Sequence, residues 1–256
     1  MPRRRRLLLL SPLPPPVGGI PTWTLGVLGS SLSERFELRV VNTSPSVKGE
    51  ISGKSQLRFD RVLDALRILG GLVWELVRFR PDIVHVNTPY HWAFLRDGIA
   101  VWVARLFGAR ALLHFRGGDF PEFVEASSPA LRRAILATLR HADRLLALTG
   151  PTRLYLEQSA GSGSVRYVPN FVRLEDFGPV PDRAGRSGPP EVLFVGWFLA
   201  AKGVRELLAA ARRLPGARFT LVGPVQPDFL AEMKPELDVL ADHVRLLPAM
   251  PREQVI

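Results

Sequence analysis

The strongest constraint on the fold is a strand, glycine turn, helix and strand that follow one another between residues 190 and 223. Val192 to Val195 is a short apolar run, typical of a strand buried on both faces, and it stops at Gly196. The next apolar residues repeat at helical spacing: Val204, Leu207, Leu208, Ala211 and Leu214. Ala217 to Val222 then predicts a second strand. A unit of this kind places its two strands parallel in one sheet.

A strand–helix–strand unit offers a binding place between the carboxyl end of its first strand and the start of its helix. Free N–H groups and the helix dipole attract phosphate there. Gly196 ends the strand, and Lys202 stands just before the helix. We therefore expect a phosphate site here, although a lysine at a helix start is otherwise an ordinary solvated side chain.

Strands and helices alternate along the rest of the chain as well. Further strands are expected at 7–10, 36–41, 83–86, 111–115, 143–148, 165–168 and 243–247, and helices from about 20 and at 57–80, 93–107, 129–140 and 227–240. Residues 179–190, rich in proline and glycine, predict a linker between a first α/β domain, 1–178, and a second, 191–256. The second is too small to complete a doubly wound sheet, so we expect a chain truncated at its C-terminus.

Composition narrows the function classes. The chain has no cysteine, which excludes disulfides and thiolate metal sites and favours the cytoplasm, and no metal site is visible. No apolar run approaches the ~18 residues of a membrane span. The net charge of +10 attracts anions such as nucleotide phosphates or acidic lipid, although an arginine-biased genome accounts for it equally well. Nucleic acid is disfavoured as a partner because no zinc-finger spacing or RNA-binding sheet motif is present.

The expected helix at 57–80 is amphipathic and rich in arginine, including Arg58, Arg61 and Arg67. Such a helix can lie on an anionic membrane face and attach the protein peripherally. The alternative is that these arginines line the wet side of a helix packed on a sheet.

Five motifs occur in an order that matches a known family. They are DIVHVNTP at 82–89, LLHFRGGDF at 112–120, ADRLLALT at 142–149, VPNFV at 168–172 and LFVGWFLAAKG at 193–203. With them, nearly the whole chain resembles the family-4 retaining glycosyltransferases of GT-B type. The resemblance implies two Rossmann-like domains facing across a cleft. It also implies sugar transfer, with retention, from a nucleotide-diphosphate sugar to a saccharide or lipid-linked acceptor, in bacterial surface polysaccharide synthesis at the inner membrane face. No cofactor beyond the donor substrate is implied.

The resemblance also assigns residue roles. Gly18 and Gly19 match the first-domain glycine loop, where backbone N–H groups approach the donor diphosphate or the acceptor, although such a pair also makes a plain tight turn. Lys202 matches the lysine that neutralises the departing diphosphate. Gly223 matches the family's glycine turn beneath the nucleotide, and Gly196, which ends the first strand of the second domain, is expected to bind the donor phosphate.

This chain departs from the family pattern at two positions. Many relatives have an arginine where Trp197 stands, and Trp197 would instead pack against a sugar, a base or the linker. Many also have His-Gly where this chain has Arg116 and Gly117, so Arg116 is the expected substrate contact, in place of His114 within the strand. Asp119 either orients Arg116 or binds a sugar hydroxyl, and a turn aspartate is the alternative.

The remaining expectations concern the acceptor and the chain end. Asn87 and Thr88 close a strand and are expected to face the acceptor, or to form an ordinary turn. Relatives carry a glutamate pair after the position of Ile256, so this chain is expected to be weakly active or inactive. The alternatives are another GT-B enzyme, such as a sugar-nucleotide epimerase, and a non-catalytic nucleotide- or membrane-binding module. A dinucleotide-dependent oxidoreductase is disfavoured because no G-x-G-x-x-G occurs.

Overall fold

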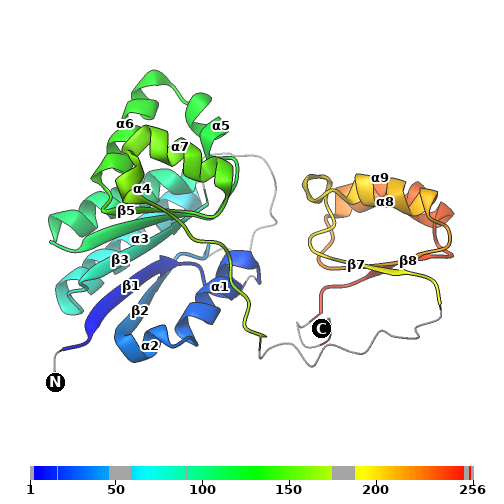
Figure 1. Ribbon diagram of the computed structural model, residues 1–256, viewed down its shortest axis with the longest axis horizontal. Helices are drawn as coiled ribbons and strands as arrows, with labels where there is room; N and C mark the ends of the chain where they lie inside the picture. Colours follow the sequence, from blue (N-terminus) through cyan, green and yellow to red (C-terminus); the bar gives the residue numbers. More distant parts are fainter. Residues whose placement is uncertain are drawn as a thin grey trace. The chain divides into compact units, whose positions relative to one another are not determined.

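A computed structural model describes residues 3–15, 17–45, 59–89, 92–174, 188–250 and 254. The chain forms two compact units, Met1–Arg173 and Leu174–Ile256 (Figure 1). Of the predicted linker, residues 179–187 lie outside the described residues, and the described part begins again at Gly188.

The first unit is built on a parallel six-stranded sheet in the order β2-β1-β3-β4-β5-β6. Its strands are β1 (Arg5–Ser11), β2 (Phe36–Asn42), β3 (Ile83–Thr88), β4 (Arg110–Phe115), β5 (Arg144–Ala147) and β6 (Val165–Tyr167). Its helices are α1 (Gly19–Leu28), α2 (Leu32–Arg35), α3 (Phe59–Arg78), α4 (Trp92–Leu106), α5 (Phe120–Glu125), α6 (Pro129–His141) and α7 (Gly150–Ala160), with a 3₁₀ turn at Ser162–Ser164. This arrangement confirms the predicted α/β class.

The two faces of this sheet are covered differently. Alternate residues such as Leu8, Leu10 and Val84 point to a large core shared with α3, α4 and α6. The opposite face packs against α1 through a smaller cluster that contains Leu7, Leu9 and Trp23. Because side chains alternate along a strand, His85, Asn87, His114 and Arg116 lie on the α1 face.

Three helices of the first unit were missed from the sequence: α2, α5 and α7. The start of α7 carries a recognisable signal, since the Thr149 side chain accepts the N–H of Thr152 and proline follows at 151. The helix is short and only Thr152 and Leu156 are buried within it, so the apolar spacing is weak.

The second unit has a parallel three-stranded sheet in the order β7-β8-β9. Its elements are β7 (Glu191–Val195), the 3₁₀ turn η3 (Ala200–Lys202), α8 (Val204–Arg213), β8 (Arg218–Val222), α9 (Pro227–Val239) and β9 (Val244–Leu247). The predicted parallel strand–helix–strand unit is therefore confirmed, with Val192 paired to Phe219.

The prediction that β7 is buried on both faces is wrong for the described part of the chain. Both α8 and α9 cover the same face of the sheet (Figure 1). On the other face Leu193 and Val195 are 55% and 59% exposed. A continuous apolar run does not reveal whether one or two layers cover it, because the strand presents the same residues in both cases.

Candidate functional site

The carboxyl edge of the first sheet meets the start of α1. Gly18 caps α1 with extended backbone, and its carbonyl accepts the N–H of Thr22 at 3.0 Å. Gly19 is exposed, and a Cβ added to it would meet no atom within 4 Å. The backbone at the predicted glycine loop is therefore open, at the edge where parallel sheets bind ligands.

A chain of buried hydroxyl and amide groups ties α1 to two strands. The Asn87 amide donates to the Ser11 hydroxyl at 2.8 Å, and the Ser11 and Thr24 hydroxyl oxygens are 2.6 Å apart. Thr24 donates in turn to the Ile20 carbonyl at 2.9 Å. Since that donation leaves the Thr24 oxygen only its lone pairs, Ser11 is the donor between the two hydroxyls. These hydrogen bonds fix the first turn of α1. They leave the buried Asn87 Oδ1 without a partner among the described residues.

Arg116 is the central charged group at this edge. It is only 9% exposed, and its guanidinium lies 4.4 Å from the ring centre of Trp23. One Nη donates to Asn170 Oδ1 at 2.7 Å, and the other lies 3.3 Å from His114 Nε2. Within the described residues no carboxylate pairs with it, and its Nε has no partner. Burial lowers the pKa of Arg116 to about 10, so it stays charged at neutral pH.

Two neutral histidines support this arginine. His114 Nδ1 lies 3.2 Å from His85 Nε2. A guanidinium only donates, so His114 Nε2 accepts and its proton sits on Nδ1, which donates to His85. Burial, with the nearby charge of Arg116, lowers the pKa of His85 to about 4; burial, with His85 and Arg116 nearby, lowers that of His114 to about 2. Arg116 is thus the one cation of this trio at neutral pH.

The chemistry of this edge is that of an anion or hydroxyl site. A buried cation without a counter-charge is costly, and a bound anion relieves that cost. Arg116 Nε and Trp23 Nε1 are buried donors without partners, and Asn87 Oδ1 is a buried acceptor without one, all within the described residues.

Not every predicted residue of the first unit joins this group. Thr88 is fully buried and, by the alternation of β3, lies on the opposite face from Asn87. Gly117 is half-buried directly after Arg116, and Asp119 is exposed at the N-cap of the short helix α5. The structure therefore places Asn87 and Arg116 on one face, with His114 paired to Asn87 in the sheet register.

In the second unit the predicted glycines hold two loops together. Gly223 has φ of 153°, and a Cβ added there would lie 1.9 Å from the Gly196 carbonyl oxygen. The Phe198 N–H donates to the Pro224 carbonyl at 2.8 Å, and the Gln226 N–H to the Phe198 carbonyl at 3.3 Å. The loops after β7 and β8 are therefore bound backbone to backbone at the carboxyl edge of this sheet.

Lys202 and Trp197 flank those loops. Lys202 ends the 3₁₀ turn before α8, and its exposed side chain makes no hydrogen bond or ion pair within the described residues. Gly203 caps α8 in the left-handed region with φ of 74°. Trp197 is half-buried. Lys202 is therefore available to a ligand at the start of α8, as a phosphate site requires.

Sequence reasoning missed Trp23, His85 and Asn170 as parts of the first site. A signal existed for His85. His85 and Asn87 alternate in β3, as do His114 in β4 and Arg116 just after it, and neighbouring parallel strands place such pairs on one face. Trp23 and Asn170 come from other elements, and only the tertiary structure brings them to Arg116.

Within the described residues, no three His, Cys, Asp or Glu side chains group closely enough to hold a metal ion. No described helix has the length and hydropathy required to cross a bilayer.

Comparison with known proteins decides the family. The family model of the glycosyl transferase 4-like domain matches residues 23–170, a range that includes Trp23, Arg116 and Asn170. The chain belongs to the glycosyl transferase 4-like family. Among its curated relatives, D-inositol 3-phosphate glycosyltransferase of Mycolicibacterium smegmatis is 30% identical over an alignment of length 202, which covers 68% of this chain and 44% of the relative. Glycogen synthase of Mycobacterium tuberculosis is 26% identical over an alignment of length 193, which covers 68% of this chain and 45% of the relative.

Solved structures show the same fold. A glycosyltransferase from Rickettsia africae superposes with a TM-score of 0.69 at 13% identity, covering 96% of this chain and 69% of that one. Anabaena HepE in complex with UDP gives 0.64 at 17% identity, covering 98% and 71%. These similarities confirm the GT-B fold type for this glycosyl transferase 4-like chain, which spans less than half the length of the curated relatives it matches.

Proposed function

We propose that this glycosyl transferase 4-like protein moves a sugar from a nucleotide-diphosphate sugar to a saccharide or lipid-linked acceptor, with retention, in bacterial surface polysaccharide synthesis at the inner membrane face. The observation that carries the proposal is Arg116, a buried cation without a carboxylate partner among the described residues, at the carboxyl edge of a parallel sheet. Family membership supports it, as does the UDP complex of a protein with the same fold.

In this proposal the two cations have separate tasks. Lys202 neutralises the charge that grows on the diphosphate as the glycosidic bond breaks, a role that suits an exposed amine at a helix start. Arg116 contacts the substrate through its unpartnered Nε, and Asn87 Oδ1 accepts a hydroxyl of sugar or acceptor. We assign no side chain as a glycosyl nucleophile.

Nucleotide binding tests both assignments. Isothermal calorimetry with UDP, GDP and ADP is expected to show binding of at least one nucleoside diphosphate. Lys202→Ala is expected to weaken it roughly 10- to 150-fold, the range for losing one hydrogen bond to a charged group. Lys234→Ala is the matched control, because Lys234 is an exposed lysine of the same unit that pairs with Asp238 on α9. Equal affinity of wild type and Lys202→Ala removes Lys202 from the site.

Arg116→Gln tests whether Arg116 contacts the substrate. The assay is the same calorimetry, with intact nucleotide sugars as ligands. We expect weaker sugar-nucleotide binding or acceptor use, with Arg153→Gln, an exposed arginine of α7, as the control. Thermal unfolding, monitored by circular dichroism, verifies that each variant folds. Binding unchanged by Arg116→Gln, together with an unchanged rate of transfer, refutes the assignment.

Transfer itself is measured as release of nucleoside diphosphate with saccharide and polyprenyl-linked acceptors, and the anomeric configuration of the product by NMR. Inversion contradicts the retaining assignment. Binding without transfer favours a non-catalytic nucleotide-binding module. An altered donor sugar without transfer favours an epimerase.

A further inference from the structure

The outer side of α3 carries an exposed apolar stripe. Six residues form it, between 39% and 63% exposed: Val62, Leu63, Leu66, Val73, Trp74 and Val77. They recur at spacings of three, four and seven, so they share one side of the helix over four turns. Ile68, Leu72 and Leu76 form a second apolar side that is buried against the sheet. A helix that only covers a sheet needs one apolar side, the side that packs against the sheet.

Two charged residues of α3, Arg67 and Glu75, bind neighbouring segments of the first unit. Arg67 donates to the backbone carbonyls of Asn42 and Ser44, and Glu75 pairs with Arg39 of β2. Arg67, which the sequence suggested as a membrane contact, is therefore engaged within the first unit, and Arg58 lies outside the described residues. The outer stripe stays apolar from Val62 to Val77.

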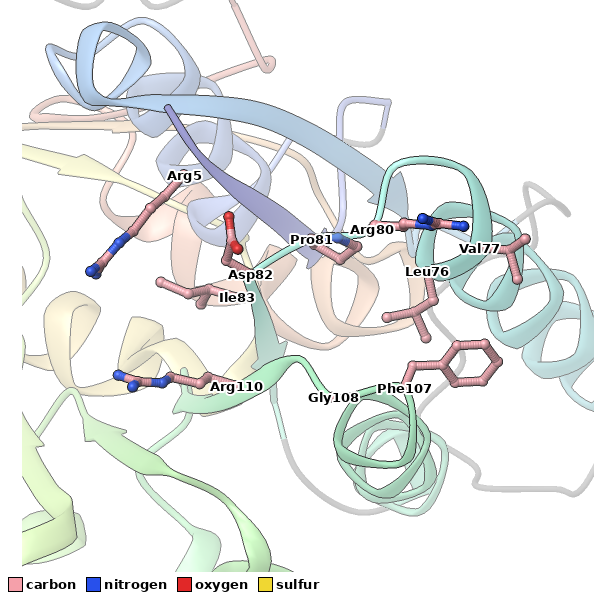
Figure 2. A pocket seen from close by; sticks show the side chains of 10 residues that line it. All are labelled: Arg5, Leu76, Val77, Arg80, Pro81, Asp82, Ile83, Phe107, Gly108 and Arg110. Atoms are coloured by element: carbon pink, nitrogen blue, oxygen red, sulfur yellow. The ribbon is translucent and has the colours of Figure 1, made fainter. Parts of the chain in front are cut away.

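The outer stripe leads to a hollow lined by arginines. Val77 belongs both to the stripe and to this hollow of about 640 Å³, which Arg5, Arg80 and Arg110 also line. Figure 2 shows Arg5 and Arg110 extending to the same side of Ile83, and Arg80 extending the other way beside Val77. In the described part of the chain none of the three forms an ion pair.

One acidic residue also lines the hollow. The Asp82 carboxylate accepts the backbone N–H of Arg6 at 2.7 Å. The C-termini of α3 and α4 lie here too, and their dipoles favour positive charge. Three arginines against one aspartate still leave a cationic hollow, at the amino ends of β1, β3 and β4. This is the edge opposite to the candidate functional site, so the two surfaces are separate.

We propose that the outer stripe and the arginine hollow dock this protein on an anionic phospholipid surface. The stripe enters the boundary between headgroups and acyl chains, and Arg5, Arg80 and Arg110 bind lipid phosphates. Trp74 sits beside the Arg78 guanidinium, 5.5 Å from the ring centre, and this pairing of an amphipathic ring with a cation suits the interfacial depth. The net charge of +10 acts in the same direction. This docking surface adds a membrane contact to the proposed function. It rests on that function only in so far as the acceptor is lipid-linked.

Vesicle flotation tests the docking surface. The full chain is mixed with phosphatidylcholine vesicles, with or without phosphatidylglycerol, in the absence of nucleotide. We expect binding to the phosphatidylglycerol vesicles that weakens as salt rises. The triple variant Arg5→Gln, Arg80→Gln, Arg110→Gln is expected to bind about 100-fold more weakly, at roughly fivefold for each arginine. Its control is Arg132→Gln with Arg133→Gln on α6, two exposed arginines away from the hollow.

The apolar part is tested with Leu66→Glu and Trp74→Glu together, against Leu154→Glu, a 60% exposed leucine of α7. Only the stripe variant should lose binding. Both substituted positions are exposed, so the variant should fold, and circular dichroism checks this. Equal binding by all variants overturns the proposal. So does a dimer that forms without vesicles and disappears in the stripe variant, which assigns the stripe to a second copy. Calorimetry with nucleotide in the absence of lipid reports separately on the proposed function.

Discussion

Replacing Gly223 by alanine tests how the second unit holds its two loops. In the structure a Cβ at this position lies 1.9 Å from the carbonyl oxygen of Gly196 and 2.7 Å from its carbonyl carbon. The obstacle is backbone, which cannot rotate away as a flexible side chain does. The φ of 153° is also one that residues with a side chain rarely adopt.

The magnitude follows from these two terms. Holding alanine at such a backbone angle costs about 1–3 kcal/mol. Displacing the backbone of Gly196, whose N–H donates to the Val222 carbonyl at 2.9 Å, costs about 1–3 kcal/mol more. We expect Gly223→Ala to lower the opening free energy of β7 and β8 by about 2–6 kcal/mol, which is a factor of roughly 30 to roughly 3 × 10⁴ in hydrogen-exchange protection.

Hydrogen exchange followed by mass spectrometry measures this locally, so the separate unfolding of the first unit does not obscure it. Gly216→Ala is the matched control in the same unit, because a Cβ there meets nothing within 4 Å and its φ is not positive. The control should differ from wild type by less than about 0.5 kcal/mol. A Gly223→Ala protein that protects β7 and β8 as well as the control refutes the reasoning.

Two further predictions concern the first unit. Thr24→Val keeps the side-chain shape but removes the hydroxyl between Ser11 and the Ile20 carbonyl. The free energy of unfolding, measured in urea, should therefore fall by about 1–3 kcal/mol. The control Thr22→Val, at an exposed position, should leave it unchanged. Burial lowers the pKa of His85 to about 4 and of His114 to about 2, so below the ordinary value of 6.5 the unfolded chain binds more protons than the folded chain. Stability should therefore fall with decreasing pH below about 6.5, by up to about 1.4 kcal/mol per pH unit for each histidine, with the His85 contribution ending near pH 4. Comparison with His85→Gln isolates one of the two slopes, and an identical pH dependence of both proteins contradicts the assignment.

The sequence predicted elements whose signal is local. The glycine-ended strand before α8 and the helical spacing from Val204 to Ala211 both appear in the structure. Periodicity works there because burial of one helix face requires apolar residues every three or four positions. It failed for β7, where Leu193 and Val195 are as apolar as their half-buried neighbours Val192 and Phe194 but remain exposed.

The sequence by itself determined the α/β class, the order of the strands along the chain, and the position of Arg116 and Asn87 at strand ends, because each depends on residues within a few positions of one another. Only the tertiary structure decided that Trp23 and Asn170 surround Arg116, that His114 and His85 support it as neutral groups, and that Gly223 must lack a side chain beside Gly196. The physical reason is that desolvation and close contact depend on which distant segments share a space. Those neighbours set the charge of a buried group and the room at a backbone position.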